Sequence, residues 1–136
     1  MTVVEFVLLT PILFIIMFGT VELGLVFYAR HVAVAAAQEG ARTAREEAYT
    51  QPNAWKRDAR RNAQNWVVSL AGGLVDGKFT PGLLGPNDVA GVVYPEVGVT
   101  VQFNVVTVVP WNFTVSARSE GPVECFYTPQ GTCNGG

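Results

Sequence analysis

Residues 3–37 read V-V-E-F-V-L-L-T-P-I-L-F-I-I-M-F-G-T-V-E-L-G-L-V-F-Y-A-R-H-V-A-V-A-A-A, and this stretch decides the fold. Between Phe6 and Ala29 the only charged side chain is that of Glu22. An apolar helix of about 20 residues is long enough to cross the hydrocarbon core of a bilayer. The stretch therefore predicts a membrane-length helix near the N-terminus.

The residues after Ala29 predict that this helix continues beyond the membrane. Residues 30–48 are rich in alanine, the best helix former, and contain no proline. We therefore expect one helix over residues 1–48, roughly 70 Å long. Its second half carries small residues at helical spacing, which let another backbone approach closely. They are Ala33, Ala37, Gly40, Ala41 and Ala44. This stripe fits either packing against the chain's own domain or contact with a neighbouring subunit.

Three residues of the apolar half need a physical explanation. Glu5 lies at the edge of an apolar segment, where an unpaired charge costs about 3 kcal/mol or more. No basic residue precedes it as in a secretory signal peptide, and the partner we expect is a free α-amino group at Met1. Pro11 removes a backbone donor and is expected to kink the helix. Glu22 is either a hydrated carboxylate at the membrane boundary or one half of an ion pair with Arg30 of a neighbouring subunit.

Residues 49–136 predict one globular head, since 136 residues leave room for a single modest core beyond the anchor. A helix is expected over about 52–71, because Pro52 suits its first turn and Gly72-Gly73 suits its end. Its apolar stripe consists of Trp55, Ala59, Ala63, Trp66, Val67 and Leu70. Residues 72–91 are rich in glycine, proline, aspartate and asparagine, so they predict a loop.

Residues 92–119 predict antiparallel strands. Apolar side chains at 97, 99, 101, 103 and 105 alternate with small or polar ones, which is the period of a half-buried strand. Phe113–Ser119 repeats this alternation as a partner strand, with a turn at 110–112. Two or three strands would pack one face against the long helix. The predicted fold class is α+β: a long N-terminal helix, a second helix and a small antiparallel sheet.

The basic residues and the cysteines bear on the cellular compartment. Residues 30–61 carry seven of the nine basic side chains, which fits a cytoplasmic flank, lipid headgroups, a phosphate patch or a partner subunit. Cys125 and Cys133 flank a segment that contains Pro129 and Gly131. This spacing favours a disulfide loop over residues 125–133, in an oxidising compartment, against two free thiols. We therefore expect the head outside the cytoplasm and the basic residues in contact with protein or headgroups.

Motifs that carry chemistry are absent from the sequence. His31 is the only histidine, and no nucleophile elbow, glycine-rich phosphate loop or metal-ligand spacing is present. We expect no catalytic residues, no metal site, no cofactor and no enzymatic activity. The run K-R-D-A-R-R at 56–61 is more typical of a solvated or subunit-contacting helix face than of a nucleic-acid site, so no nucleic acid is predicted as a partner.

The N-terminal third resembles the type IV filament superfamily and, within it, the TadE-like pseudopilins of tight-adherence pili. The resemblance covers roughly residues 2–45. It rests on the apolar helix together with Glu5, Pro11, Glu22-Leu23-Gly24, Tyr28 and Glu39-Gly40-Ala41-Arg42. It implies cleavage by a prepilin peptidase, a processed or methylated α-amine, storage in the inner membrane, and assembly by a pilus platform into an extracellular homopolymer.

Two functions fit these observations. In the first, the chain is a structural pilin subunit, and Glu5 neutralises the Met1 amine of an adjacent subunit so that the register is fixed. In the second, it is a minor pseudopilin or a bitopic membrane protein whose head is an accessory or binding module. The sequence distinguishes neither a major from a minor subunit nor adhesion, motility, DNA uptake and secretion as the use of a filament.

Overall fold

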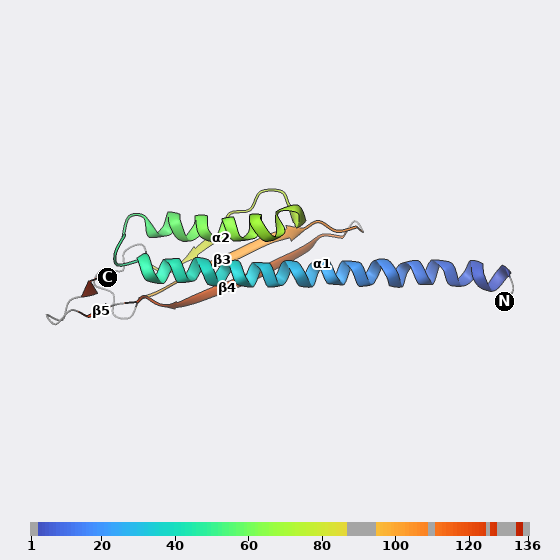
Figure 1. The fold of residues 1–136 in the computed structure, drawn as a ribbon, viewed down its shortest axis with the longest axis horizontal. Helices are drawn as coiled ribbons and strands as arrows, with labels where there is room; N and C mark the ends of the chain where they lie inside the picture. Colours follow the sequence, from blue (N-terminus) through green and yellow to red (C-terminus); the bar gives the residue numbers. More distant parts are fainter. Residues whose placement is uncertain (1–2, 87–94, 109–110, 125, 128–132, 135–136) are drawn as a thin grey trace.

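The computed structural model describes residues 3–86, 95–108, 111–124, 126–127 and 133–134. Its helices are α1 (Val3–Glu47), α2 (Trp55–Ala71) and the short 3₁₀ helix η1 (Gly72–Leu74). Its strands are β1 (Val75–Asp76), β2 (Gly82–Leu84), β3 (Glu96–Val105), β4 (Phe113–Pro122), β5 (Phe126–Tyr127) and β6 (Cys133–Asn134). Figure 1 shows the N-terminal half of α1 projecting alone from a head that contains its C-terminal half. The predicted α+β fold is confirmed.

Strand β3 is the centre of a four-stranded antiparallel sheet. Strand β4 pairs with one edge of β3 along its whole length, with Val101 opposite Ala117. Strands β1 and β2 share the other edge, where Val75 lies opposite Val105 and Leu83 opposite Val99. Strands β5 and β6 form a separate two-stranded sheet. Every strand of the larger sheet is therefore held by β3.

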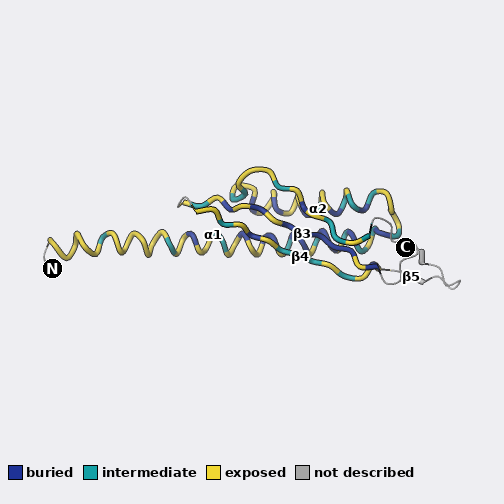
Figure 2. Tube along the Cα trace, turned by 180° about the vertical axis from the view of Figure 1, so that it is seen from behind, coloured by how far each residue is buried: buried dark blue, intermediate teal, exposed yellow. Residues whose placement is uncertain are grey.

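The core lies between this sheet and the two helices. Val97, Val99, Val101, Phe103 and Val105 of β3 are all buried, as the predicted alternation requires. Helices α1 and α2 lie side by side over this face, with α1 against β3 and β4 and α2 reaching β2 and β3 (Figure 1). Figure 2 shows burial concentrated where these elements meet, while the free half of α1 is exposed.

Element boundaries differ from the prediction in three places. Helix α2 begins at Trp55 rather than at about residue 52, because residues 52–54 form turns. The loop predicted over 72–91 is wrong at 75–76 and 82–84, which pair as β1 and β2 with backbone groups of β3 that would otherwise form an open edge. The strands predicted over 92–119 are β3 and β4, of which β4 continues to Pro122; residues 92–94 lie outside the described residues.

The predicted apolar stripe of α2 is wrong at two positions. Trp55, Ala59, Ala63, Val67 and Ala71 are buried. Trp66 and Leu70 are instead more than a third exposed. The buried residues repeat every four positions, so the face that α2 presents to α1 and the sheet is narrow and neighbouring positions lie at its rim. The rim is held to α1 by the Tyr28 hydroxyl, which donates a hydrogen bond to the Leu70 carbonyl oxygen at 2.9 Å.

Candidate functional site

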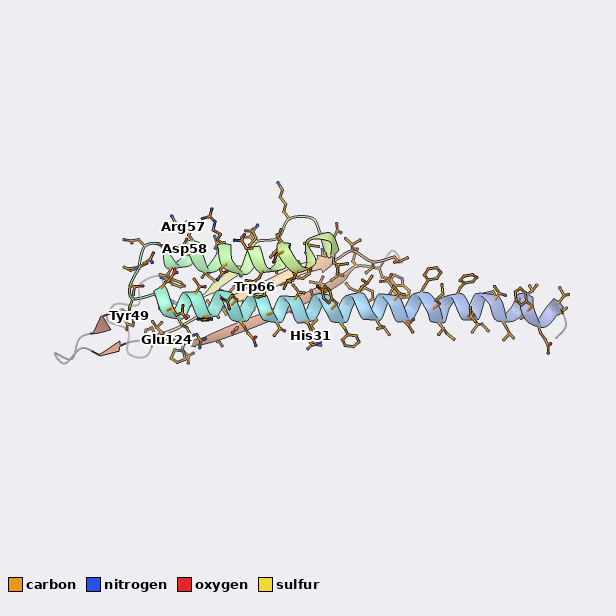
Figure 3. All side chains as sticks on the ribbon, in the orientation of Figure 1. His31, Tyr49, Arg57, Asp58, Trp66 and Glu124 are labelled. Atoms are coloured by element: carbon orange, nitrogen blue, oxygen red, sulfur yellow. The ribbon has the colours of Figure 1, made fainter. Side chains whose placement is uncertain are left out.

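The first half of α1 is an apolar surface that the rest of the chain leaves uncovered. All of residues 3–21 are exposed except Thr10 and Gly19, which are half-buried. Among the described residues, α1 is the one helix long and apolar enough to cross a membrane, and the apolar window lies wholly outside the packed head. Figure 3 shows these side chains radiating from the helix in all directions. A helix that is apolar all round needs an apolar environment, so this half of α1 indicates membrane anchoring.

Helix α1 passes through Pro11 without interruption. Pro11 has no N–H to donate to the Val7 carbonyl, four residues earlier. Just before it, the Thr10 hydroxyl donates to the Phe6 carbonyl oxygen at 2.6 Å, so this polar side chain is satisfied within the helix. A second hydroxyl, that of Thr20, donates to the Met17 carbonyl oxygen at 2.8 Å. The helix therefore continues through Pro11. The kink expected at this residue stays a prediction.

Glu5 lies in the first turn of α1 and is exposed. A carboxylate in the first turn interacts favourably with the helix dipole, typically by about 0.3–1 kcal/mol. This is a local stabilisation that the sequence argument for Glu5 did not include. Met1 lies outside the described residues, so the pairing of its amine with Glu5 stays a prediction.

Glu22 is the buried acidic residue of the apolar half, with only 6% of its surface exposed. It lines a groove between α1 and the segments that flank the β3–β4 connection, including Trp111. The interpretation of Glu22 as a hydrated carboxylate is therefore wrong, because the head covers this side chain, while its position at the membrane boundary stays a prediction. Arg30 is exposed and lies about 12 Å farther along α1. An ion pair between Glu22 and Arg30 of a neighbouring subunit stays a prediction.

The small-residue stripe of α1 packs against the chain's own head. Ala33, Ala37, Gly40, Ala41 and Ala44 are all buried. A Cβ atom placed on Gly40 would lie 2.9 Å from the Ala63 Cβ atom of α2 and 3.1 Å from Val99 Cγ2 of β3. Glycine is required here because α2 and β3 both lie too close to the α1 backbone to leave room for a Cβ atom. Of the two interpretations of the stripe, packing within the chain is the one that the structure confirms.

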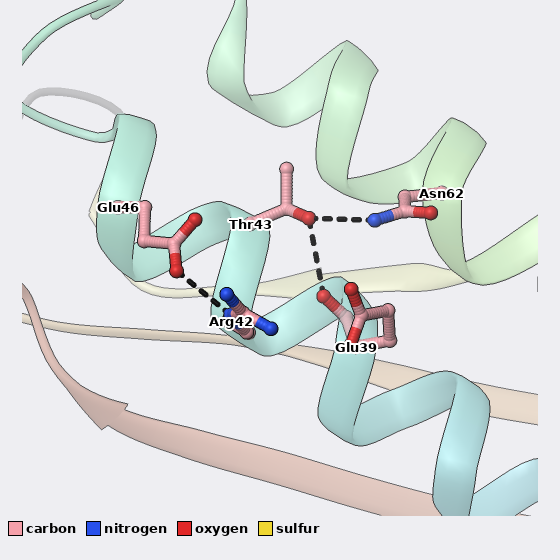
Figure 4. Close-up of polar contacts among 5 residues, drawn as sticks. All are labelled: Glu39, Arg42, Thr43, Glu46 and Asn62. Carbon is pink, nitrogen blue, oxygen red and sulfur yellow. Dashed lines mark hydrogen bonds and ion pairs between the residues drawn. The ribbon is translucent and has the colours of Figure 1, made fainter.

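Polar side chains at the end of α1 connect it to α2 (Figure 4). Asn62 donates to the Thr43 hydroxyl oxygen at 2.8 Å, and that hydroxyl donates to the Glu39 carbonyl oxygen at 3.1 Å. Arg42 binds Glu46 at 2.8 Å, and this hydrogen bond raises the pKa of the Arg42 guanidinium. The ion pair is exposed, so it contributes little to stability. The sequence argument missed the bridge between Thr43 and Asn62, since nothing in the spacing of the two residues places them opposite each other.

Glu47 at the end of α1 makes the stability of the head depend on pH. Burial raises the pKa of its carboxyl group, and the nearby charges of Asp58 and Glu46 raise it further. Because the pKa is higher in the folded state, Glu47 contributes most at acidic pH, and that contribution is lost as the pH rises through the raised value. Glu47→Gln should therefore raise the melting temperature slightly at neutral pH, within the roughly 0.5 kcal/mol usual for surface changes.

The same comparison at about pH 4, where Glu47 is largely protonated, should show no gain. Circular dichroism of the full chain in detergent measures both melting temperatures. Glu120→Gln is the matched control: it removes an exposed carboxylate of β4 that pairs with Arg118 and is not among the charges that raise the pKa of Glu47, so it should not stabilise the head at either pH. An equal gain from Glu47→Gln at both pH values would contradict the assignment.

The basic side chains of α2 are partly engaged by the head. Arg57 binds the adjacent Asp58 at 3.0 Å, and Arg60 donates to the Pro81 carbonyl oxygen at 3.2 Å. Lys56 lies over the Trp55 ring at 5.4 Å from its centroid.

The predicted disulfide between residues 125 and 133 cannot be placed, because Cys125 lies outside the described residues and only the backbone of Cys133 in β6 is assigned.

The exposed apolar half of α1 and the head that encloses its other half are typical of a membrane-anchored protein with a single projecting helix. Residues 1–42 match the model of the family described as TadE-like protein. The predicted resemblance is thereby confirmed over these residues, and it indicates a protein associated with Tad pili. No curated protein and no solved structure matches the chain.

Proposed function

We propose that the chain is a pilin-like structural subunit that leaves the membrane to form a filament through the exposed half of α1. The observation that supports this most is the division of α1. Its first half is apolar on all sides and uncovered, while its second half is built into the core of the head. One continuous helix thus connects an apolar surface, which must be buried in lipid or protein, to a head with an ordinary hydrophobic core.

The assembly step in this proposal is physical rather than chemical, and no catalytic residue is involved. A helix already in lipid gains no hydrophobic free energy when it moves against other apolar helices. Close packing and paired charges must therefore supply the preference for the filament. Glu5, paired with the α-amine of an adjacent subunit, would fix the axial register, which is the best-attested use of a buried ionic group. A prepilin peptidase and a pilus assembly platform are the partners that the resemblance implies.

A second candidate function is that of a minor pseudopilin or membrane-anchored accessory protein of the pilus apparatus. The match to the TadE-like family favours it, because that match covers the anchor and the start of the head without requiring a major-subunit role. The head would then act as a binding module held at the membrane surface. The two proposals share the anchor and differ in the final location of the protein.

Filament preparations from cells that produce the chain would test the proposal. Surface filaments sheared from such cells should contain the chain as a main component and appear as helical fibres by electron microscopy. Mass spectrometry should show a processed α-amine at the first residue of the mature protein. Recovery of the chain only in the detergent-extracted membrane fraction, with an unprocessed N-terminus and no fibres, would overturn the subunit proposal in favour of the accessory role.

A further inference from the structure

Helix α1 and the residues on either side of positions 109–110, between β3 and β4, line an apolar groove of about 980 Å³. These residues are called the segments that flank the β3–β4 connection. One wall consists of residues 14–26 of α1, and the other of Val108, Trp111 and Phe113. Figures 1 and 2 show these flanking segments reaching farther along α1 toward the N-terminus than α2 does. The groove therefore opens onto the same exposed apolar surface that anchors the protein.

The head-side wall exposes large apolar side chains where a strand connection is normally polar. Val108 is 62% exposed and Trp111 is 63% exposed. The described residues here contact one another: the Thr107 hydroxyl donates to the Trp111 carbonyl oxygen at 2.7 Å, and the Trp111 and Phe113 rings meet edge to face at 6.4 Å. An exposed apolar surface of this kind marks a contact with a partner or a membrane.

The position of the groove along α1 indicates which contact it makes. Glu5 and Glu22 are 17 residues apart, or about 25 Å along the helix, which is close to the thickness of a hydrocarbon core of about 30 Å. Glu22 therefore lies near the boundary of the hydrocarbon core on the side of the head. The hydrogen bond between Tyr28 and Leu70 places the end of α2 about 9 Å farther out, outside the core.

We propose that the segments flanking the β3–β4 connection form a membrane-contacting element, with Val108 and Trp111 in the interface of the leaflet on the head's side and lipid acyl chains in the groove. Tryptophan is enriched at this level of membranes because its ring is apolar and its N–H is polar. Glu22 also lines the groove, but it is only 6% exposed, so little of its surface would meet the acyl chains, where a charge is costly. The apolar surface of the groove is continuous with that of the membrane-spanning half of α1, and this continuity selects lipid as the occupant.

This inference rests on membrane anchoring and not on filament formation. It applies to a stored pilin subunit and to a permanent accessory protein alike. In the membrane, lipid fills the groove in place of the apolar helix of a second copy of the chain.

The three tryptophans of the chain allow a matched test in vesicles. Trp66→Phe leaves Trp111 as the exposed reporter, and Trp111→Phe leaves Trp66, which is 39% exposed and lies about one helical turn of α2 beyond Leu70. Trp55 is buried in both variants and contributes a constant background. Each full-length variant is reconstituted into phosphatidylethanolamine and phosphatidylglycerol vesicles whose acyl chains are brominated near the headgroup.

We expect bromine to quench Trp111 several-fold more strongly than Trp66, and to the same extent at every ratio of protein to lipid. Val108→Asp in the Trp66→Phe background should reduce this quenching and shift the Trp111 emission to longer wavelength. Equal weak quenching of Trp111 and Trp66 would overturn the proposal. Quenching that disappears as the protein density rises would also overturn it, because a second copy would then be displacing lipid from the groove.

Discussion

Replacing Gly40 by leucine is expected to destabilise the head by about 3 kcal/mol or more, since overpacking of a tight core typically costs 1–3 kcal/mol and occasionally more. A Cβ atom at this position would meet Ala63 Cβ at 2.9 Å, the Ala59 carbonyl oxygen at 3.1 Å and Val99 Cγ2 at 3.1 Å. These contacts come from backbone or from short side chains, which have no flexible end to move aside. Helices α1 and α2 would have to separate from each other or from the sheet.

Thermal unfolding of the full chain in detergent, followed by circular dichroism, measures this effect. The matched control is Gly24→Leu on the same helix, where an added Cβ atom meets nothing within 4 Å. That variant should leave the melting temperature close to that of the wild type. Gly40→Ala should be intermediate, because alanine gains about 1 kcal/mol of helix propensity that offsets part of the overlap. A wild-type melting temperature for Gly40→Leu would show that α1 packs less tightly against α2 and β3 at Gly40 than the structure describes.

Replacing Glu5 by valine is expected to reduce filament yield by more than about tenfold, since breaking a buried charge pair costs about 3–5 kcal/mol and each 1.4 kcal/mol changes an association constant tenfold. Valine suits the apolar segment, so the variant should still insert into the membrane. Glu5 lies about 52 Å along α1 from Gly40, so the core of the head should be unaffected. The expected result is a folded, membrane-bound protein that assembles poorly.

Electron microscopy of sheared filaments and the melting temperature of the membrane form measure the two halves of this prediction. Glu5→Gln should also impair assembly, because the charge rather than the volume of the side chain is required. Glu120→Ala is the control: this carboxylate lies on the head, where it pairs with Arg118 at the surface. Normal fibres from Glu5→Val would show that Glu5 does not set the register.

The elements that could be predicted from the sequence are those whose signal is local. The length of α1 follows from a run of helix formers, and the burial of β3 from the alternation of Val97 to Val105, which any half-buried strand shows. Strands β1 and β2 could not be predicted, because two or three residues have no measurable periodicity. They exist as strands only because β3 offers an edge with which they pair.

The candidate site was predictable in part for the same reason. Glu5, Pro11 and Glu22 stand out in the sequence because each interrupts an apolar run. The groove beside Glu22 could not be predicted, because it depends on how far the β3–β4 connection extends along α1. One signal was present, namely the apolar residue Trp111 in the turn expected at 110–112, where polar residues are usual.

The continuity of α1 between lipid and head has a mechanical consequence. At 1.5 Å per residue its 45 residues form a lever about 67 Å long. The structure describes no flexible linker between the anchored half and the half that the head grips. Tension on the head is therefore borne along the axis by the backbone hydrogen bonds of a single helix, and a small tilt of the anchored half swings the far end of the head through many ångströms.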